Sequence, residues 1–187
     1  ARAHGATVFA TARNDEKCAS MRTLGAHHPI NYKDTDFAEA CRAATEGRGV
    51  DVVIDIIGGD YLPKEVELLA HGGRLMIINL RGGKLAEVDF GHVHARHLTI
   101  TGARLRPRSI TEKSAICRAL EANIWPLFAD GTISPVTYTI LPFAEAGEAH
   151  RLMESSQHIG KIILAAWGGA PSRRLRANLP HQGDTTW

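Results

Sequence analysis

Residues 50–57 read VDVVIDII and are followed by two glycines. A short, almost wholly apolar run that ends in a glycine turn is typical of a parallel strand buried on both faces. Residues 74–79 (RLMIIN) repeat the pattern, and residues 61–70 between the two runs are expected to form a helix that stops at Gly72-Gly73. We therefore predict successive parallel strands connected by a helix.

The same alternation of strands and helices continues on both sides of this segment. The predicted elements are a strand in 6–11, a helix capped by Asn14 and running to Leu24, a strand in 29–31, a helix beginning at Asp34 or Thr35 and ending at 47–49, and a strand in 98–101. Alternating strands and helices joined by glycine turns predict an α/β fold with a doubly wound parallel sheet, the Rossmann arrangement.

The start of the chain indicates which Rossmann strand comes first. Residues 1–5 (ARAHG) look like the end of a helix with its C-terminal glycine, and residues 6–11 then look like the second strand of the unit. The first strand and the glycine-rich phosphate loop should lie upstream of residue 1. We therefore expect the C-terminal part of a longer enzyme, a fragment with a Rossmann sheet lacking its first strand.

The pattern changes after residue 108. The predicted elements are a long helix from Ser109 or Thr111 to about Ala129, a strand in 136–141, a helix in 143–153 and a last strand in 161–165. Pro126 should kink the long helix or end its regular part. We assign 1–134 to an incomplete Rossmann dinucleotide-binding domain. Residues 168–187 are rich in Gly, Pro, Arg and polar residues and are expected to be a disordered tail.

Composition excludes several classes of function. A net charge of +2 gives no electrostatic reason to expect binding to nucleic acid or to a membrane. No apolar run approaches the roughly 18 residues of a membrane span. Cys18, Cys41 and Cys117 form no CxxC pair, so a zinc knuckle and a thioredoxin motif are excluded. We expect a reducing compartment, the cytoplasm.

A possible cofactor site begins where the strand in 6–11 ends. In NAD-specific Rossmann folds an acidic residue at this point binds the adenosine ribose 2′-hydroxyl, but this chain has Arg13. Lys17 follows one helical turn later, so both cations can face one 2′-phosphate, which favours NADPH. The alternative is a solvated basic turn.

Three further segments follow predicted strands. Tyr32 could flank the adenine, or it could be an ordinary half-buried tyrosine. The segment from Asn79 to Gly83 contains Gly82 and Gly83, which would let the backbone approach a nicotinamide ring. The arginines of residues 104–108 form a solvated loop or contact cofactor or substrate.

Other motifs give no site. His92, His94 and His97 do not predict a metal, because residues i and i+2 diverge on a helix and no Cys or carboxylate completes the set. No GxSxG elbow occurs. Residues 47–52 (GRGVDV) are not a phosphate loop, because Val52 takes the place of the last glycine and a strand follows. We name no catalytic residue and no metal ligand.

Five segments together resemble the medium-chain dehydrogenase/reductase superfamily, and in particular its zinc-independent quinone oxidoreductase branch, which includes zeta-crystallin. These segments are LGAHHPINYKDTDF (24–37), GVDVVIDIIGG (49–59), GGRLMIINLRGG (72–83), LTITGARLRPRS (98–109) and FAEAGEAHRLMESSQHIGKIIL (143–164). The resemblance covers about residues 1–166.

The resemblance implies an N-terminal GroES-like catalytic domain and a Rossmann domain, with residues 135–167 as a C-terminal segment that returns to the GroES-like domain. It implies that Lys17 and Tyr32 grip the adenosine phosphate of NADPH, whereas relatives often carry a small residue at Arg13. It places Asn79, Gly82 and Gly83 on one nicotinamide-side loop and Leu105-Arg106 on another. The family reduces quinones and related enones by hydride transfer without a metal.

The leading hypothesis is an NADPH-dependent reductase that transfers a hydride to a small quinone or enone, present here as a part that lacks activity alone. One alternative is a zinc-type alcohol dehydrogenase of the same superfamily, whose ligands would lie upstream. Another is a non-catalytic nucleotide-binding or interaction module. The apolar strand in 98–101 is expected at a sheet edge, so we predict that the complete protein is a homodimer joined near residues 98–105.

Overall fold

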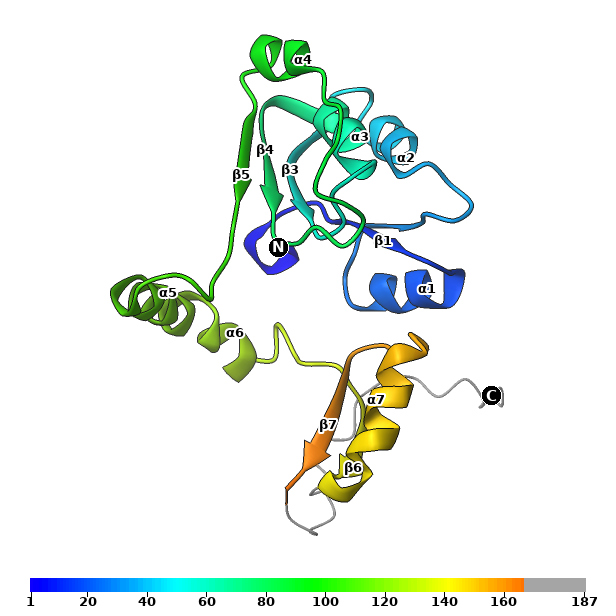
Figure 1. Cartoon of the computed structure of the whole chain (residues 1–187), viewed down its shortest axis with the longest axis vertical. Coiled ribbons are helices and arrows are strands. Elements are labelled where there is room, and N and C mark those ends of the chain that lie inside the picture. Colours follow the sequence, from blue (N-terminus) through cyan, green and yellow to red (C-terminus); the bar gives the residue numbers. More distant parts are fainter. Residues whose placement is uncertain (167–187) are drawn as a thin grey trace. The chain divides into compact units, whose positions relative to one another are not determined.

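The computed structural model describes residues 1–166, which divide into two compact units, one of residues 1–124 and one that begins at residue 125. The first unit alternates strands and helices (Figure 1). Its elements are η1 (Arg2–His4), β1 (Phe9–Ala12), α1 (Asp15–Thr23), β2 (His28–Asn31), α2 (Phe37–Ala44), β3 (Val50–Asp55), α3 (Tyr61–Leu68), β4 (Leu69–Ile77), α4 (Phe90–Ala95), β5 (Thr99–Gly102) and α5 (Ile110–Asn123).

All strand pairs in this unit are parallel, which confirms the predicted α/β class. β1 pairs with β2, with Thr11 opposite Ile30, and a separate sheet has the order β3-β4-β5, with Ile54 opposite Met76. These strands follow the Rossmann order 3-2-1-4-5-6 if β1 is its second strand and β3 its fourth. In residues 1–166 no strand pairs with both β1 and β3 to join their sheets, so the Rossmann sheet is in two pieces.

Two clusters of buried side chains hold the first unit together. Ile30 of β2 packs with Cys41 of α2 and Leu68 of α3. Leu69 and Leu75 of β4 pack with side chains of α3, α4 and β3. The helices α2 and α3 therefore lie side by side over one face of the strands (Figure 1).

The opposite face of β3 is open in the described chain. Val52, Ile54 and Ile56 are 46%, 67% and 44% exposed, whereas Val53 packs against the buried cluster of β4. Successive side chains of a strand point to opposite faces, so one face of β3 meets helices and the other meets none within residues 1–124. The prediction that residues 50–57 are buried on both faces is therefore wrong for this chain.

The boundary between α3 and β4 also differs from the prediction. The helix ends at Leu68, and β4 begins directly at Leu69, which is fully buried, rather than after Gly72-Gly73. Gly72 instead lies within the strand with a φ of 72°, and its N–H donates to Arg96 O at 2.7 Å. The glycine pair therefore shapes an irregularity inside β4 and does not end the helix.

The start of α2 differs from the prediction, and the predicted long helix is divided near Pro126. The cap of α2 is Asp36, whose side chain accepts hydrogen bonds from Ala38 N and Glu39 N, rather than Asp34 or Thr35. The predicted long helix is two helices, α5 and α6 (Trp125–Ala129), with Pro126 in the first turn of α6. Proline is tolerated in a first turn because its missing N–H has no partner there.

The second unit is a small βαβ arrangement. It contains α6, β6 (Thr137–Pro142), η2 (Phe143–Glu145), α7 (Ala146–Glu154) and β7 (Lys161–Ala165). β6 and β7 are parallel neighbours, and Ala149 is buried on the connecting helix. The predicted tail, 168–187, lies outside the described residues. In residues 1–166, no helix has the length and apolar character needed to cross a membrane.

Candidate cofactor site

The carboxyl ends of β1 and β2 meet at one edge of their sheet. Ala12 lies opposite Asn31, and Tyr32 N donates to Ala12 O at 3.0 Å. Arg13 directly follows β1 and is exposed, and Tyr32 directly follows β2. Because both strands are parallel, the two loops share the edge at which open α/β sheets bind ligands.

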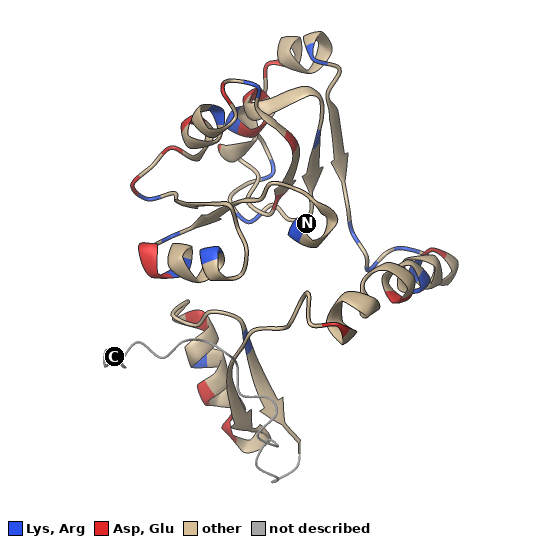
Figure 2. Ribbon diagram, turned by 180° about the vertical axis from the view of Figure 1, so that it is seen from behind, with Lys and Arg blue, Asp and Glu red and all other residues tan. Residues whose placement is uncertain are grey.

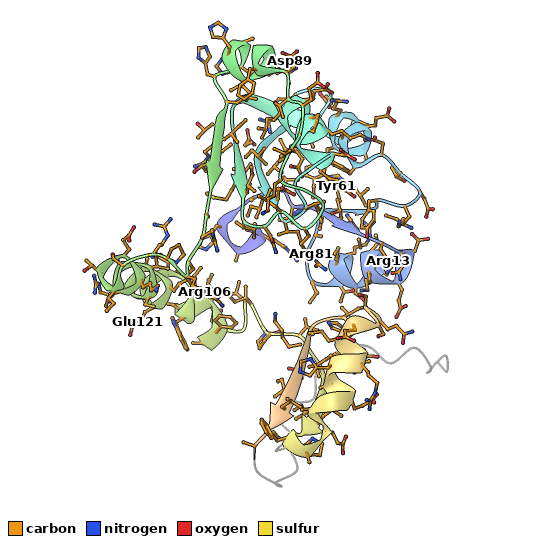
Figure 3. All side chains as sticks on the ribbon, viewed as in Figure 1. Arg13, Tyr61, Arg81, Asp89, Arg106 and Glu121 are labelled. Atoms are coloured by element: carbon orange, nitrogen blue, oxygen red, sulfur yellow. The ribbon has the colours of Figure 1, made fainter. Side chains whose placement is uncertain are left out.

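The start of α1 is tied to the same edge. Asn14 caps the helix by accepting a hydrogen bond from Lys17 N at 2.9 Å. The Asn31 side chain donates to Asp15 Oδ1 at 3.0 Å and to a carboxylate of the following loop. The structure thus places Arg13, Lys17 and Tyr32, which the sequence analysis selected, around one edge, and Figure 3 shows Arg13 beside α1.

A hollow of about 380 Å³ opens beside Tyr32. It is lined by Tyr32, Lys33, Asp34, Thr35, Asp36, Phe37, Asp60, Tyr61 and Lys64. The Phe37 and Tyr61 rings stack with centroids 5.4 Å apart, and Lys64 pairs with Asp36, so its wall offers aromatic surface and charges of both signs. Figure 2 shows basic and acidic positions side by side on α2 and α3.

The sequence alone does not indicate the α3 side of this hollow. Asp60 and Tyr61 follow the glycine pair that ends the β3 segment, just as Tyr32 follows β2. The rule that selected Tyr32, a tyrosine after a strand's carboxyl end, could have selected Tyr61 too. The two loops are far apart in sequence, so only the fold shows that they line one hollow.

A second pair of loops meets where β3 and β4 end. Gly82 N donates to Ile57 O at 2.7 Å, and Gly58 forms an isolated parallel bridge with Gly83. A Cβ on Gly58 would lie 2.6 Å from Gly83 O, so only glycine allows this approach. Asn79 Oδ1 accepts a hydrogen bond from Leu80 N. The structure therefore brings Asn79, Gly82 and Gly83 against the β3 turn.

The other predicted pair, Leu105 and Arg106, lies on the exposed loop between β5 and α5. The loop starts beside β4, because Ala103 N donates to Ile77 O at 2.9 Å. Arg106 O accepts from Lys113 Nζ of α5 at 3.0 Å. Among residues 1–166, no hydrogen bond joins either residue to the Asn79–Gly83 loop.

Two buried carboxyl groups stand behind the β3 turn, and the sequence analysis missed both. Asp55 is 2% exposed and Glu65 5% exposed. Burial, followed by the charge of Asp55 and a hydrogen bond with it, raises the pKa of Glu65 to about 7. The signal in the sequence was an aspartate inside the apolar run VDVVIDII, but its glutamate neighbour ten residues later could only be found in the fold.

The part of the chain that the structure describes offers no metal centre. Within it, no three or more His, Cys, Asp or Glu side chains gather closely enough to hold an ion. His92 lies on α4 and is 3.7 Å from Asp89, and His97 contacts the ring of His71. No zinc ligand set is therefore assigned to residues 1–166.

Comparisons with known proteins agree with this fold. The profile of the family described as zinc-binding dehydrogenase matches residues 24–164. The chain is 34% identical over 165 residues to a mycocerosic acid synthase-like polyketide synthase of Mycolicibacterium smegmatis, covering 88% of this chain and 8% of that protein. It is 30% identical over 165 residues to the quinone oxidoreductase of Rattus norvegicus, covering 88% and 48%. The crystal structure of a 2-haloacrylate reductase matches with a TM-score of 0.72 at 32% identity, covering 89% of this chain and 52% of that one.

The parallel sheets and the loops at their carboxyl ends define a Rossmann-type domain. The chain belongs to the zinc-binding dehydrogenase family, within the medium-chain dehydrogenase/reductase superfamily, whose oxidoreductases use nicotinamide cofactors. This confirms the resemblance seen in the sequence. The chain spans about half the length of the rat quinone oxidoreductase and a small fraction of the polyketide synthase.

Proposed function

We propose that the chain is the cofactor-binding part of an NADPH-dependent reductase that transfers a hydride to a quinone or an enone. The observation that carries this proposal is the pair of cations at the end of β1, Arg13 and Lys17, where an NAD-specific fold would keep an acidic residue. Tyr32 lies at the same edge and supplies an aromatic face and a hydroxyl.

The preference for NADPH follows from charge. The 2′-phosphate of NADPH is an anion, and a guanidinium or ammonium group binds it through charge-assisted hydrogen bonds. An aspartate at Arg13 would repel that phosphate and would accept a hydrogen bond from the 2′-hydroxyl of NADH instead. The hollow beside Tyr32 leaves room for an aromatic base.

The substrate class is proposed from the relatives. One relative is a quinone oxidoreductase and another is a 2-haloacrylate reductase, so both names describe reduction of an electron-poor acceptor. The bound nicotinamide would supply the hydride, and the protein would bind and orient the two reactants. Asn79, Gly82 and Gly83 are the residues of this chain that would line the nicotinamide side, because their loop can approach a ring closely.

The 2′-phosphate can be tested without the complete enzyme. Adenosine 2′,5′-bisphosphate and 5′-AMP differ only by that phosphate, and titrating each into the 187-residue chain by calorimetry isolates its contribution. We expect the bisphosphate to bind at least about tenfold more tightly, which corresponds to about 1.4 kcal/mol. Equal affinity for the two ligands would contradict the assignment of Arg13 and Lys17. An exposed pair such as Arg48-Asp51 gives a control variant, Arg48→Ala, which should leave the ratio unchanged.

A dimeric, cytoplasmic enzyme is part of this proposal. Cys18, Cys41 and Cys117 are all free thiols, which is compatible with a reducing compartment. β5 lies at an edge of its sheet, where pairing with a second copy would cover it.

A further inference from the structure

The carboxyl groups of Asp55 and Glu65 are the most deeply buried ionisable pair in the described part of the chain. Asp55 ends β3, and its two oxygens accept hydrogen bonds from Ile57 N at 2.7 Å and Gly58 N at 2.8 Å. Glu65 lies on the buried side of α3, and its Oε2 has no hydrogen-bond partner. One carboxyl group thus holds the turn after β3, and the other stands next to it with an unsatisfied oxygen.

The charged groups around this pair are engaged elsewhere. On α3 itself, Lys64 pairs with Asp36 and Glu67 pairs with Arg42 of α2. From α4, Arg96 donates to the backbone oxygens of Glu67 and Leu69. Burial and Asp55 are the causes that raise the pKa of Glu65 to about 7, and no cation is among them. Glu65 therefore faces another carboxylate without a compensating positive charge.

Two neighbouring carboxyl groups in a buried site without a cation are more stable when they share one proton than when both are ionised. A protonated Glu65 can donate its O–H to Asp55, which removes the like-charge repulsion and leaves Asp55 free to accept from the backbone. Ionisation of Glu65 releases that proton to solvent and puts two negative charges side by side in a buried site, which is costly.

We propose that Glu65 is a positioning residue whose proton keeps Asp55 bound to the turn after β3. Through Asp55, the protonated form fixes the turn at Ile57–Gly59. That turn in turn supports the loop at Gly82-Gly83, because Gly82 N bonds to Ile57 O and Gly58 bridges Gly83. Loss of the proton loosens both loops, so they respond to pH near neutrality.

The consequence for the cofactor rests on the proposed function. If Asn79 to Gly83 line the nicotinamide, loosening of their support lowers the affinity for NADPH as the pH rises. The adenosine end depends on other residues, so adenosine 2′,5′-bisphosphate should bind with much less dependence on Glu65. This difference separates the two ideas experimentally.

Hydrogen–deuterium exchange of the complete enzyme tests the loops directly. Exchange in segments 56–60 and 80–84, corrected for the intrinsic effect of pH, is compared at about pH 5.5 and about pH 8.5. We expect the protection of both segments in the wild type to fall at least tenfold at the higher pH. This is the change expected if protonation of Glu65 stabilises the closed loops by about one pKa unit. Exchange in segment 37–44 of α2 reports on global opening, and its protection should change much less between the two pH values.

Variants at two neighbouring positions make the test specific. Glu65→Gln keeps the shape and cannot ionise, so its loops should stay protected at both pH values. Glu67→Gln removes an exposed carboxyl on the same helix, and its profile should follow the wild type. Glu65→Met, an apolar variant of similar length, provides a second non-ionisable side chain if the glutamine variant folds poorly.

Several results would overturn the proposal. One is a Glu65→Gln profile that falls with pH as the wild-type profile does. A second is a wild-type chain whose 56–60 segment is unprotected even at the lower pH. A third is that both Glu65 variants lose protection at every pH, which indicates a packing role alone. If the loops respond as expected but NADPH affinity does not, the positioning role stands and the assignment of the nicotinamide loop fails.

Discussion

At the scale of single residues, the proposed preference for NADPH rests on the cations at the end of β1. Arg13 precedes the cap of α1 and Lys17 lies in its first turn, so both are anchored by a helix start whose N–H groups also favour an anion. Asn14 and Asn31 keep this start beside the end of β2. The geometry is local, which is why the sequence alone could suggest it.

Replacement of Lys17 by alanine should reduce the preference for NADPH over NADH. Losing a charge-assisted phosphate contact costs about 1.5–3 kcal/mol, or about tenfold to a hundredfold in binding. The ratio of kcat/KM for the two cofactors in the complete enzyme measures it. Arg22→Ala removes a cation from the last turn of the same helix and should leave the ratio as it is. A Lys17→Ala enzyme with the wild-type ratio would contradict the role.

Glu65 should make the stability of the chain fall as the pH rises through neutrality. Its pKa is raised from 4.5 to about 7 in the folded chain, so the native state binds more protons than the unfolded state between these values. The free energy of unfolding therefore decreases by about 3 kcal/mol from about pH 4.5 to about pH 7 and then levels off. Urea unfolding at a series of pH values should show this slope in the wild type and not in Glu65→Gln.

Asp36 has a lowered pKa, the opposite of the shift at Glu65, and this limits the gain in stability at low pH. The hydrogen bond from Lys64 lowers the pKa of Asp36, so this group stabilises the fold above its unfolded pKa and the contribution is lost as the pH falls further. Maximum stability is thus expected on the acidic side of neutrality. A stability maximum above pH 8 would contradict the role assigned to Glu65.

At the scale of elements, the two faces of the β3-β4-β5 sheet should respond differently to mutation. Leu75 is fully buried in β4, so Leu75→Ala leaves a cavity and costs about 2–5 kcal/mol. Ile54 points to the open face and is 67% exposed, so Ile54→Thr in the 187-residue chain should change the free energy of unfolding by about 0.5 kcal/mol or less. Denaturant unfolding of both variants measures this. A large loss for Ile54→Thr would show that this face is covered.

The edge strand β5 supports the prediction of a dimer. Ala103 N bonds to Ile77 O of β4, and alternate residues of a strand direct their backbone groups to opposite sides, so the N–H of Ile100 points away from β4. Ile100→Pro should therefore weaken pairing with a second copy and spare the β4–β5 ladder. Light scattering of the complete enzyme should give a dimer for the wild type and for Ile100→Val, and a monomer for Ile100→Pro. A monomeric wild type at micromolar concentration would count against the prediction.

Elements whose ends are marked by local chemistry could be predicted from the sequence, and others could not. The last strand, 161–165, was predicted with the bounds that the structure shows, and Asn14 was identified as a cap. The start of β4 was missed because Leu69 and Ala70 favour a helix equally well, and only packing against β3 makes them a strand. Capping residues and turns in the sequence predict where a helix or strand ends, whereas tertiary contacts can shift that boundary.

The candidate site divides in the same way. Arg13 and Tyr32 directly follow strands and Lys17 lies in the first turn of the next helix, so position alone suggested them as candidates. The pairing of Asp55 with Glu65 depends on how α3 packs against β3, which no spacing in the sequence specifies. A buried polar pair of this kind therefore cannot be predicted from the sequence pattern alone.

At the scale of the whole molecule, the separation of the strands into two sheets limits stability. The edges of β1 and β3 that would face a central Rossmann strand pair with no strand of residues 1–166. Unsatisfied backbone groups cost roughly 1–3 kcal/mol each when buried, and a domain has only about 5–15 kcal/mol in total. We expect the 187-residue chain to unfold at low temperature and to bind NADPH weakly.

Calorimetry and NADPH titration of the isolated chain check this expectation together. The phosphate-binding loop of a Rossmann unit supplies the amides that hold the pyrophosphate, and residues 1–166 contain no G-x-G-x-x-G sequence of the kind that forms this loop. A cooperative transition near the temperatures of ordinary mesophilic domains, together with micromolar NADPH affinity, would show that the two sheets are sufficient.

The open face and edge of β3 have a consequence for how the chain behaves in a cell. The segment VDVVIDII combines β-branched residues with an exposed strand edge, which is a template for intermolecular cross-β stacking. Asp51 interrupts the apolar run with a surface charge and so acts as a gatekeeper. High-level expression of residues 1–187 alone should therefore direct them into inclusion bodies.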